Sequence, residues 1–347
     1  MAYTTIDDPS AYFQTALYTG NGGTQSITNN GNSDLQPDWI WIKSRNEAEH
    51  HNLVDSVRGN TKVVYSSLTG VEDTTSIQVT SFASDGFALG SGTNTNKNTI
   101  TYAAWQWKAG TSFSNDASST SVGSIDSAGS VSTAAGFSII SYTGTGANAT
   151  IAHGLGVAPS MIITKSRGTT NNWGIYNKNL GNTNAVFLNL TNASDAASTY
   201  WNNTSPTSSV FSVGSAAGTN PSATMIAYCF AEKKGYSKFG SYTGNGNANG
   251  TFVYTGFKPA FFLLKNSSSA GSWVLVDAKR PGFNVINDSL NTNNANVENT
   301  ATVCDFTSNG VKLRTNADHM NGSYTFIFMA FAENPFVTST GVPAMAR

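Results

Sequence analysis

One short motif recurs three times along the chain and sets its organisation. The pentapeptide Tyr-Thr-Gly-Asn-Gly occupies residues 18–22 and 242–246, and residues 142–146 differ from it at a single position. A run of residues that favour extended backbone leads into each copy. Asn-Gly after such a run is a strong hairpin signal, because both residues accept the positive φ of a type I′ turn. Each copy therefore predicts a strand that ends in a turn and opens a new structural unit.

The spacing of other residues from this motif shows that whole units repeat. Pro37, Pro159 and Pro259 each open an apolar stretch, and a lysine follows six residues later in every case. Twelve residues after that lysine comes an aspartate or an asparagine, just behind a second apolar stretch. The chain of 347 residues thus holds three copies of a unit of about 100 residues. The recurring polar positions are Lys43 with Asp55, Lys165 with Asn177, and Lys265 with Asp277.

The pattern predicts an all-β protein. No stretch shows sustained helical periodicity, and short apolar or alternating runs are separated by turn residues. About six to eight short strands in each unit are typical of a sandwich, so we expect three tandem antiparallel β-sandwiches of jelly-roll type. The stretch from proline to lysine is apolar on both faces. It should therefore be a central strand, or one that a neighbouring module covers.

The repeats divide the chain into six predicted segments. Between the first two repeats lies a linker rich in Ser, Gly and Ala, residues that bury little surface, although it has room for a strand at 121–125. The third repeat follows the second with no linker at all. In order, the segments are an N-terminal arm (1–11), repeat 1 (12–110), the linker (111–136), repeat 2 (137–235), repeat 3 (236–335) and a C-terminal tail (336–347).

Charge and cysteine content exclude several classes of function. A formal net charge of −1 gives no long-range attraction for nucleic acid or for an anionic membrane surface. No apolar run approaches the roughly 20 residues of a membrane-spanning helix. Cys229 and Cys304 occupy unmatched positions in different repeats, which favours two buried free thiols over a disulfide. We expect no cofactor, no nucleic-acid partner and no membrane insertion.

No motif in the chain identifies a reaction. Glycoside hydrolysis needs two carboxylates about 5–10 Å apart across one sugar ring. The few glutamates lie in expected loops or, like Glu232 and Glu333, at equivalent strand ends, as structural residues do. The four histidines lack the spacing of metal ligands. We therefore expect a non-enzymatic protein without a metal site, in which the recurring Lys and Asp or Asn positions form cross-strand pairs.

One loop without a counterpart in the other repeats is the candidate for a binding site. Tyr200, Trp201 and Asn202 combine aromatic rings, on which sugars stack, with an amide that can hydrogen-bond a hydroxyl. This combination gives a glycan-binding hypothesis for repeat 2. The alternative is that Trp201 packs against the adjoining repeat or another subunit.

Several longer stretches resemble a known protein family. They are "QPDWIWIKSR", "GFKPAFFLLKN", "AYCFAEKKGYSKFGSYTGNG" and the closing "AFAENPF" with "GVPAMAR". In these stretches the chain resembles β-rich repeat proteins that are frequent in marine and cyanobacterial phages. The resemblance implies sandwiches like those of concanavalin-type lectins, in virion proteins such as tail fibres, spikes or capsid-associated appendages. It implies no particular functional residue.

Together, the residues and the resemblance lead to an expected function. We expect a non-enzymatic phage structural protein on the virion, a tail-fibre or spike component that takes part in host attachment. Its expected partners are further copies of itself in a homotrimer, other virion proteins, and a host surface glycan. The first alternative is a capsid or tail decoration protein that serves assembly without binding a receptor. A polysaccharide-degrading enzyme is the second alternative, which the absence of paired carboxylates disfavours.

Overall fold

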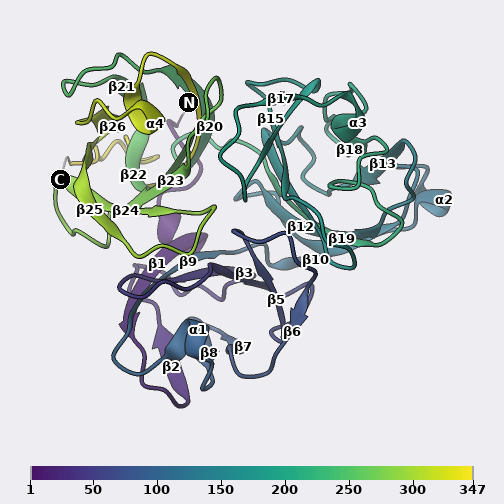
Figure 1. The fold of residues 1–347 in the computed structure, drawn as a ribbon, viewed down its shortest axis with the longest axis horizontal. Coiled ribbons are helices and arrows are strands. Elements are labelled where there is room, and N and C mark those ends of the chain that lie inside the picture. Colours follow the sequence, from purple (N-terminus) through teal and green to yellow (C-terminus); the bar gives the residue numbers. More distant parts are fainter. Residues whose placement is uncertain (1, 346–347) are drawn as a thin grey trace.

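Three lobes of antiparallel sheet surround a common centre in the computed structural model, which describes residues 2–345 (Figure 1). The purple-to-blue lobe is repeat 1, the teal lobe is repeat 2 and the green-to-yellow lobe is repeat 3. Among the described residues, far more lie in strands than in helices, and each helix is a single turn. The predicted all-β fold class is confirmed.

A main sheet with the same strand order recurs in every repeat. In repeat 1 the order is β1 (Phe13–Thr19), β9 (Thr101–Trp107), β3 (Trp39–Ser44), β4 (Asn52–Asp55), β5 (Lys62–Tyr65) and β6 (Asp73–Thr74). In repeat 2 it is β12 (Phe137–Thr143), β19 (Thr224–Phe230), β14 (Met161–Ser166), β15 (Gly174–Asn177), β16 (Asn184–Phe187) and β17 (Asp195–Ala196). In repeat 3 it is β20 (Ser237–Thr243), β27 (Thr325–Pro335), β22 (Phe257–Asn266), β23 (Trp273–Asp277) and β24 (Ile286–Asn291).

Further strands and helical turns complete each repeat. Repeat 1 adds β2 (Gln25–Thr28), β8 (Gly86–Leu89) and β7 (Val79–Ala83), and repeat 2 adds β13 (Ala149–Ala152) with β18 (Val210–Val213). In repeat 3, β25 (Asn299–Thr307), β26 (Gly310–Leu313) and β21 (Phe252–Tyr254) continue the main sheet beyond β24. The helical turns are η1 (Pro9–Ala11), α1 (Thr93–Asn96), α2 (Ala117–Thr120), α3 (Ser198–Trp201) and α4 (Asp318–Asn321).

The recurring pentapeptide does not form the predicted hairpin turn. β1 pairs with β9 and β2 pairs with β8, so the motif connects strands that are not hydrogen-bonded to each other. A buried asparagine fixes each connection instead: Asn96 Oδ1 accepts the Asn21 N–H at 2.9 Å, and Asn220 and Asn321 do the same for the second and third copies. Only the last glycine of each motif has positive φ. The hairpin prediction is wrong because a tertiary partner, rather than the turn itself, satisfies the backbone.

The first glycine of the motif recurs for a packing reason. A Cβ atom added to Gly20 would lie 2.3 Å from the Lys97 carbonyl oxygen. At Gly144 and Gly244 the corresponding distances to backbone oxygens are 2.1 and 2.0 Å. Backbone therefore passes too close for any side chain, and each copy requires glycine at this position.

The predicted linker is folded and belongs to repeat 2. β10 (Thr111–Asn115) and β11 (Ser127–Ser132) extend the main sheet of that repeat beyond β12, with α2 between them. The linker prediction is wrong because backbone hydrogen bonds to β12 order a segment whose small side chains bury little apolar surface. The strand considered at 121–125 lies instead at Ser127–Ser132.

The two ends of the described chain contact each other, and the N-terminal arm also contacts repeats 2 and 3. In the N-terminal arm, Tyr3 Oη donates to the Gly256 carbonyl at 2.6 Å and Thr4 Oγ1 to the Lys234 carbonyl at 2.8 Å. In the tail, the Ser339 N–H donates to Asp7 Oδ1 at 2.6 Å. The predicted arm thus contacts the end of repeat 2, repeat 3 and the predicted tail. Residues 1 and 346–347 of these predicted segments lie outside the described residues.

Each main sheet is covered by apolar groups on both faces. One face packs on the inner core of its own repeat, and the other faces a core shared by all three repeats. In the shared core, Trp39 stacks on Tyr228 with ring centroids 4.4 Å apart, and Phe331 contacts both Trp107 and Phe230. The expectation for the strands from proline to lysine is confirmed, because β3, β14 and β22 are central and their apolar residues are buried from both sides. The repeats therefore form one body around an approximate threefold axis.

Candidate functional site

The three seams between repeats, called here seams 1–2, 2–3 and 3–1, contain most of the buried polar groups that recur. A backbone hydrogen bond crosses each seam at an equivalent position and closes the ring of repeats. The three bonds are Glu72 N–H to Arg167 O at 2.9 Å, Ser194 N–H to Ser267 O at 2.9 Å, and Glu298 N–H to Arg45 O at 2.7 Å.

A ring N–H at the start of the fourth strand of each main sheet, or one residue before it, also crosses each seam. Trp173 Nε1 donates to the Tyr65 carbonyl at 3.0 Å, and Trp273 Nε1 donates to the Phe187 carbonyl at 2.8 Å. At the same position repeat 1 has His51, whose Nε2 lies 3.1 Å from the Asn291 carbonyl oxygen. Because Trp41 Nε1 donates to His51 Nδ1 at 2.8 Å, the imidazole is the neutral tautomer with its proton on Nε2. The histidine therefore replaces the tryptophan donor without loss of the seam contact.

The recurring lysines hold carbonyl oxygens rather than carboxylates. Lys165 Nζ donates to the Thr69 carbonyl across seam 1–2, and Lys265 Nζ donates to the Thr191 carbonyl across seam 2–3, both at 3.0 Å. Lys43 Nζ instead donates within its own repeat, to the carbonyls of Ser44 and Glu47. Burial lowers the pKa of each of these lysines to about 8.

The predicted pairing of Lys43 with Asp55, and of Lys265 with Asp277, is wrong. Asp55 lies opposite Trp39 in the pairing of β3 with β4, at the far end of β3 from Lys43. Asp277 likewise lies opposite Phe261. Where these positions contact a neighbouring repeat, the lysine and the aspartate bind different groups: Lys265 donates to the Thr191 carbonyl of repeat 2, whereas Asp277 accepts the Trp105 N–H of repeat 1.

Seam 1–2 contains a chain of four charged side chains. Asp55 Oδ2 binds Arg58 Nε at 2.5 Å and accepts the Tyr228 hydroxyl from repeat 2 at 2.8 Å. Arg58 Nη1 lies 3.3 Å from Glu72, which in turn binds Arg167 Nε of repeat 2 at 2.7 Å. Asp55 and Arg58 are fully buried, and the neighbouring carboxylates, Asp55 above all, raise the pKa of Arg58 against the effect of burial.

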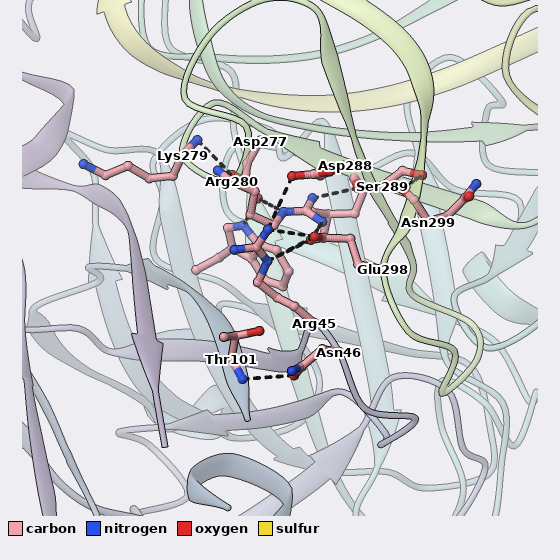
Figure 2. Close-up of polar contacts among 12 residues, drawn as sticks. Arg45, Asn46, Thr101, Asp277, Lys279, Arg280, Asp288, Ser289, Glu298 and Asn299 are labelled. Atoms are coloured by element: carbon pink, nitrogen blue, oxygen red, sulfur yellow. Dashed lines mark hydrogen bonds and ion pairs between the residues drawn. The ribbon is translucent and has the colours of Figure 1, made fainter. Parts of the chain in front are cut away.

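Seam 3–1 repeats this arrangement with the equivalent residues (Figure 2). Asp277 Oδ2 binds Arg280 Nε at 2.6 Å and accepts Trp105 Nε1–H from repeat 1 at 3.0 Å. Glu298 then joins Arg280 to Arg45 of repeat 1, at 2.8 and 2.7 Å respectively. Asp288 adds a fifth charge 3.3 Å from Arg45, and its pKa is raised by burial and by the nearby carboxylate of Glu298.

Seam 2–3 has neutral residues at the corresponding positions. Asn177 replaces the aspartate, Leu180 the arginine and Ser194 the glutamate. The Ser194 hydroxyl donates to the Ser267 carbonyl at 2.9 Å, where the other seams have a guanidinium on a carboxylate. The position of repeat 3 equivalent to Tyr228 and Trp105 is Met329, which has no hydrogen-bond donor. Among the described side chains, Asn177 Nδ2 is buried without a partner.

A family model described as a domain of unknown function (DUF7483) matches residues 8–335. The chain belongs to this family. The match covers all three repeats as a single domain, in agreement with the shared core and the closed ring of seams. No curated protein and no solved structure matches the chain. Within the described part of this DUF7483 chain, no helix has the length and apolarity needed to cross a bilayer.

The predicted exposed aromatic of this DUF7483 chain is buried. Trp201 is 1% exposed within the inner core of repeat 2, where its ring makes an edge contact with Tyr176. Tyr200 is half-buried against Phe187, and the Asn202 carbonyl accepts a bond from Thr204 Oγ1. The prediction of an exposed contact at Trp201 is wrong, because the single turn α3 directs the indole inward. The alternative, that Trp201 packs against the adjoining repeat or another subunit, is not what the structure shows either, since the indole packs within its own repeat.

In this structure the charged groups of the domain form ion pairs that join its elements. Each seam carboxylate is bound by a guanidinium, Glu232 binds Lys178 at 2.7 Å, and Glu333 lies 3.4 Å from Lys258. Across residues 2–345 no three His, Cys, Asp or Glu side chains gather so as to hold a metal ion. Cys229 and Cys304 are free and buried, as predicted.

Sequence reasoning missed the seam partners. An arginine, Arg58 or Arg280, comes three residues after each of the two aspartates. In repeat 2, where the aspartate is replaced by Asn177, the residue three positions later is Leu180. That joint change is a signal within the sequence that these residues form a set.

Proposed function

We propose that this protein is a non-catalytic structural protein of a phage virion, a tail-fibre or spike component that takes part in host attachment. The observation that supports this proposal best is the closed ring of three repeats, in which buried charges and the largest aromatic side chains are used to join the repeats. Such a chain is a rigid block, which suits a displayed appendage. The placement on a virion comes from the resemblance of the sequence to phage repeat proteins.

Host attachment through a glycan needs an exposed aromatic surface, and repeat 3 offers one. Tyr254 and Phe252, on β21, are 52% and 44% exposed. Lys238 Nζ lies 5.6 Å from the centre of the Tyr254 ring, and Lys234 Nζ lies 4.5 Å from the Tyr3 ring. Exposed rings flanked by ammonium groups can stack on a sugar and attract an acidic substituent. This surface replaces the loop around Trp201 as our candidate glycan contact.

The partners in this proposal are a host surface glycan and other virion proteins. A homotrimer, if it forms, uses outer surfaces of the lobes, because the faces of the main sheets that look toward the threefold axis are already buried within one chain. The same observation favours a second candidate function. A block with three closed seams also suits a capsid or tail decoration protein that stabilises a particle without binding a receptor.

Binding to cells separates the two candidates. Fluorescently labelled protein is incubated with a panel of marine bacteria and cyanobacteria, and bound protein is counted by flow cytometry. The attachment function predicts saturable binding to some strains that falls when Tyr254 and Phe252 are both changed to serine. Val157→Ser is the matched control, since Val157 is 46% exposed but lies in repeat 2. Absence of saturable binding across the panel would favour the decoration function, and loss of surface polysaccharide during incubation would favour an enzyme.

A further inference from the structure

The first strand of the main sheet has different neighbours in the three repeats. In repeat 2 this strand, β12, is covered by β11, which is itself covered by β10. The equivalent strands β1 and β20 are the edge strands of their sheets. The same position in the fold is therefore covered once by the chain's own backbone and left open twice.

The hydrogen-bond register shows which backbone groups face outward on these edges. In repeat 3, Gly244 N–H donates to the Tyr324 carbonyl and Ala332 N–H to the Tyr236 carbonyl, on either side of the pairing of β20 with β27. Antiparallel pairs alternate, so the even-numbered residues of β20 bond β27 and Ser241 faces outward. The same reasoning places Leu17 of β1 outward, and places Ser141 of β12 toward Ala128 of β11.

The outward groups are accessible at Leu17 of β1 and at Ser241 of β20. Elsewhere on β20 the Ser237 N–H donates to the Lys233 carbonyl, and the Phe239 carbonyl accepts Asn179 Nδ2–H. Leu17 is 39% exposed and Ser241 is exposed. Within residues 2–345 the backbone N–H and C=O of these two residues have no hydrogen-bond partner. In repeat 2, β11 covers Phe137 to Ile139. The equivalent residues of repeat 1 are Phe13 to Thr15, and they line a cavity of about 120 Å³. The Thr15 hydroxyl is buried there without a partner among the described residues.

These edges lack the features that usually protect an edge strand. Natural proteins block such strands with charged side chains, proline or a bulge, because unpaired backbone groups template the addition of another strand. The sequence of β1 has no charge and no proline, and β20 has Lys238 alone near its start. The open edges are therefore suited to pairing.

We infer that β1 and β20 are acceptor edges for strands supplied by another polypeptide. The covered edge of repeat 2 shows the chemistry of the occupant: an extended, antiparallel segment of small uncharged residues such as Ser127–Ser132. Main-chain hydrogen bonds give the affinity in this mode of recognition, and small residues fit because the backbone of the acceptor strand lies close. At Gly129 of β11, an added Cβ would lie 1.8 Å from the Ile139 carbonyl oxygen. The inference does not depend on the virion proposal.

A peptide with the sequence of residues 111–133, labelled with a fluorophore, is the probe. It reproduces β10, α2 and β11, and it is titrated with the intact protein while fluorescence anisotropy is recorded. Leu17→Pro and Ser241→Pro are combined to block both edges, since a proline is tolerated where the N–H faces outward. The matched control is Ser141→Pro, whose N–H faces β11, and which should lower the melting temperature of the protein.

The acceptor edges predict saturable binding that weakens by at least about tenfold in the double variant, while its melting temperature stays close to that of the parent. Hydrogen exchange should show protection of β1 and β20 on peptide binding and none elsewhere. Equal binding of a scrambled peptide, or undiminished binding by the double variant, would overturn the inference. Concentration-dependent self-association that the two prolines abolish would also overturn it, because the occupant would then be a second copy of this chain.

Discussion

Seams 1–2 and 3–1 are ionic, whereas seam 2–3 is neutral, although all three join equivalent surfaces of equivalent repeats. The ionic seams each have an Asp, an Arg and a Glu on one side, with a hydroxyl or indole donor and a second Arg on the other. In the neutral seam every member of this set is replaced. The buried carboxylates and guanidinium groups are thus present as a complete set or absent as a complete set.

The physical reason is that a partial set is the costly state. Replacing a whole buried ion pair by apolar residues is often neutral in free energy, whereas removing one partner leaves an uncompensated charge. Leu180 beside Asn177 follows this rule, because an arginine there would have no buried carboxylate on its own strand.

Chain connectivity accounts for which seam is neutral. Repeat 3 follows repeat 2 directly, so the covalent link itself holds these two repeats side by side at high effective concentration. The main sheets of repeats 1 and 2 are joined through the folded segment 111–136 of repeat 2, and repeats 3 and 1 have no direct link at all. The ionic sets lie at the seams where the chain constrains the geometry least, which indicates that they specify which faces meet.

The largest effect should come from breaking one ionic set. Asp277→Leu removes the fully buried carboxylate that binds Arg280 Nε and leaves the Trp105 N–H without its acceptor. We expect a loss of about 3–5 kcal/mol in the free energy of unfolding, measured with urea. The matched control, Asn177→Leu in the neutral seam, should lose less, about 1–2 kcal/mol, because it removes only the neutral hydrogen bonds that Asn177 Oδ1 accepts from Asn179. Equal losses in the two variants would contradict the distinction between the seams.

Converting the fully buried part of an ionic set into its neutral counterpart should cost less than breaking it. The triple variant Asp55→Asn, Arg58→Leu and Tyr228→Met gives this part of seam 1–2 the residues of seam 2–3 and leaves Glu72 bound to Arg167. We expect it to lie within about 2 kcal/mol of the parent, while Asp55→Asn alone loses more than the triple variant. Urea unfolding of the three single variants and the triple variant tests this. Additive losses would show that the residues do not act as a set.

The sequence predicted the framework of the fold but not the seams. Strands such as β3 and β22 could be located because apolar residues between a proline and a lysine mark them three times over. The partners of Lys165 and Asp277 could not be predicted, because both residues contact a different repeat. No local sequence pattern indicates which residues of another repeat lie close in the fold. The linker prediction failed for the same reason, since β11 is ordered by its pairing with β12 rather than by its own composition. Trp201 was predicted to be exposed because the residues around it are polar. Its indole is nevertheless buried, and the neighbouring sequence gives no indication of this.

An intermediate effect is expected from the outer part of the ionic sets. Glu298→Gln keeps the shape of the side chain but removes the charge that joins Arg45 to Arg280. Hydrogen bonds to charged groups contribute about 1.5–3 kcal/mol, and we expect a loss in that range. Ser194→Ala, at the same position in the neutral seam, should lose about 1 kcal/mol or less. Thermal unfolding of both variants at two salt concentrations checks the assignment, since added salt should reduce the difference only if charge causes it.

The smallest effect concerns the lysines, which are buried in ionic and neutral seams alike. Burial lowers the pKa of Lys165 and Lys265 to about 8 in the folded protein, whereas an unfolded lysine titrates near 10.4. Between these values the unfolded state binds more protons, so the free energy of unfolding should rise with pH from about 8 to about 10. Above that range the buried tyrosines, whose pKa values burial raises, should reverse the trend as unfolded tyrosines ionise.

Substitution isolates the contribution of each lysine to this slope. Lys165→Met in the ionic seam and Lys265→Met in the neutral seam should each flatten the rise by no more than about 1 kcal/mol per pH unit. The two reductions should be similar, because burial is the cause of the lowered pKa in both cases. Urea unfolding between pH 7.5 and 10 provides the measurement. A slope that is flattened at one seam but not at the other would show that the charges of the ionic set, rather than burial, control the titration of the neighbouring lysine.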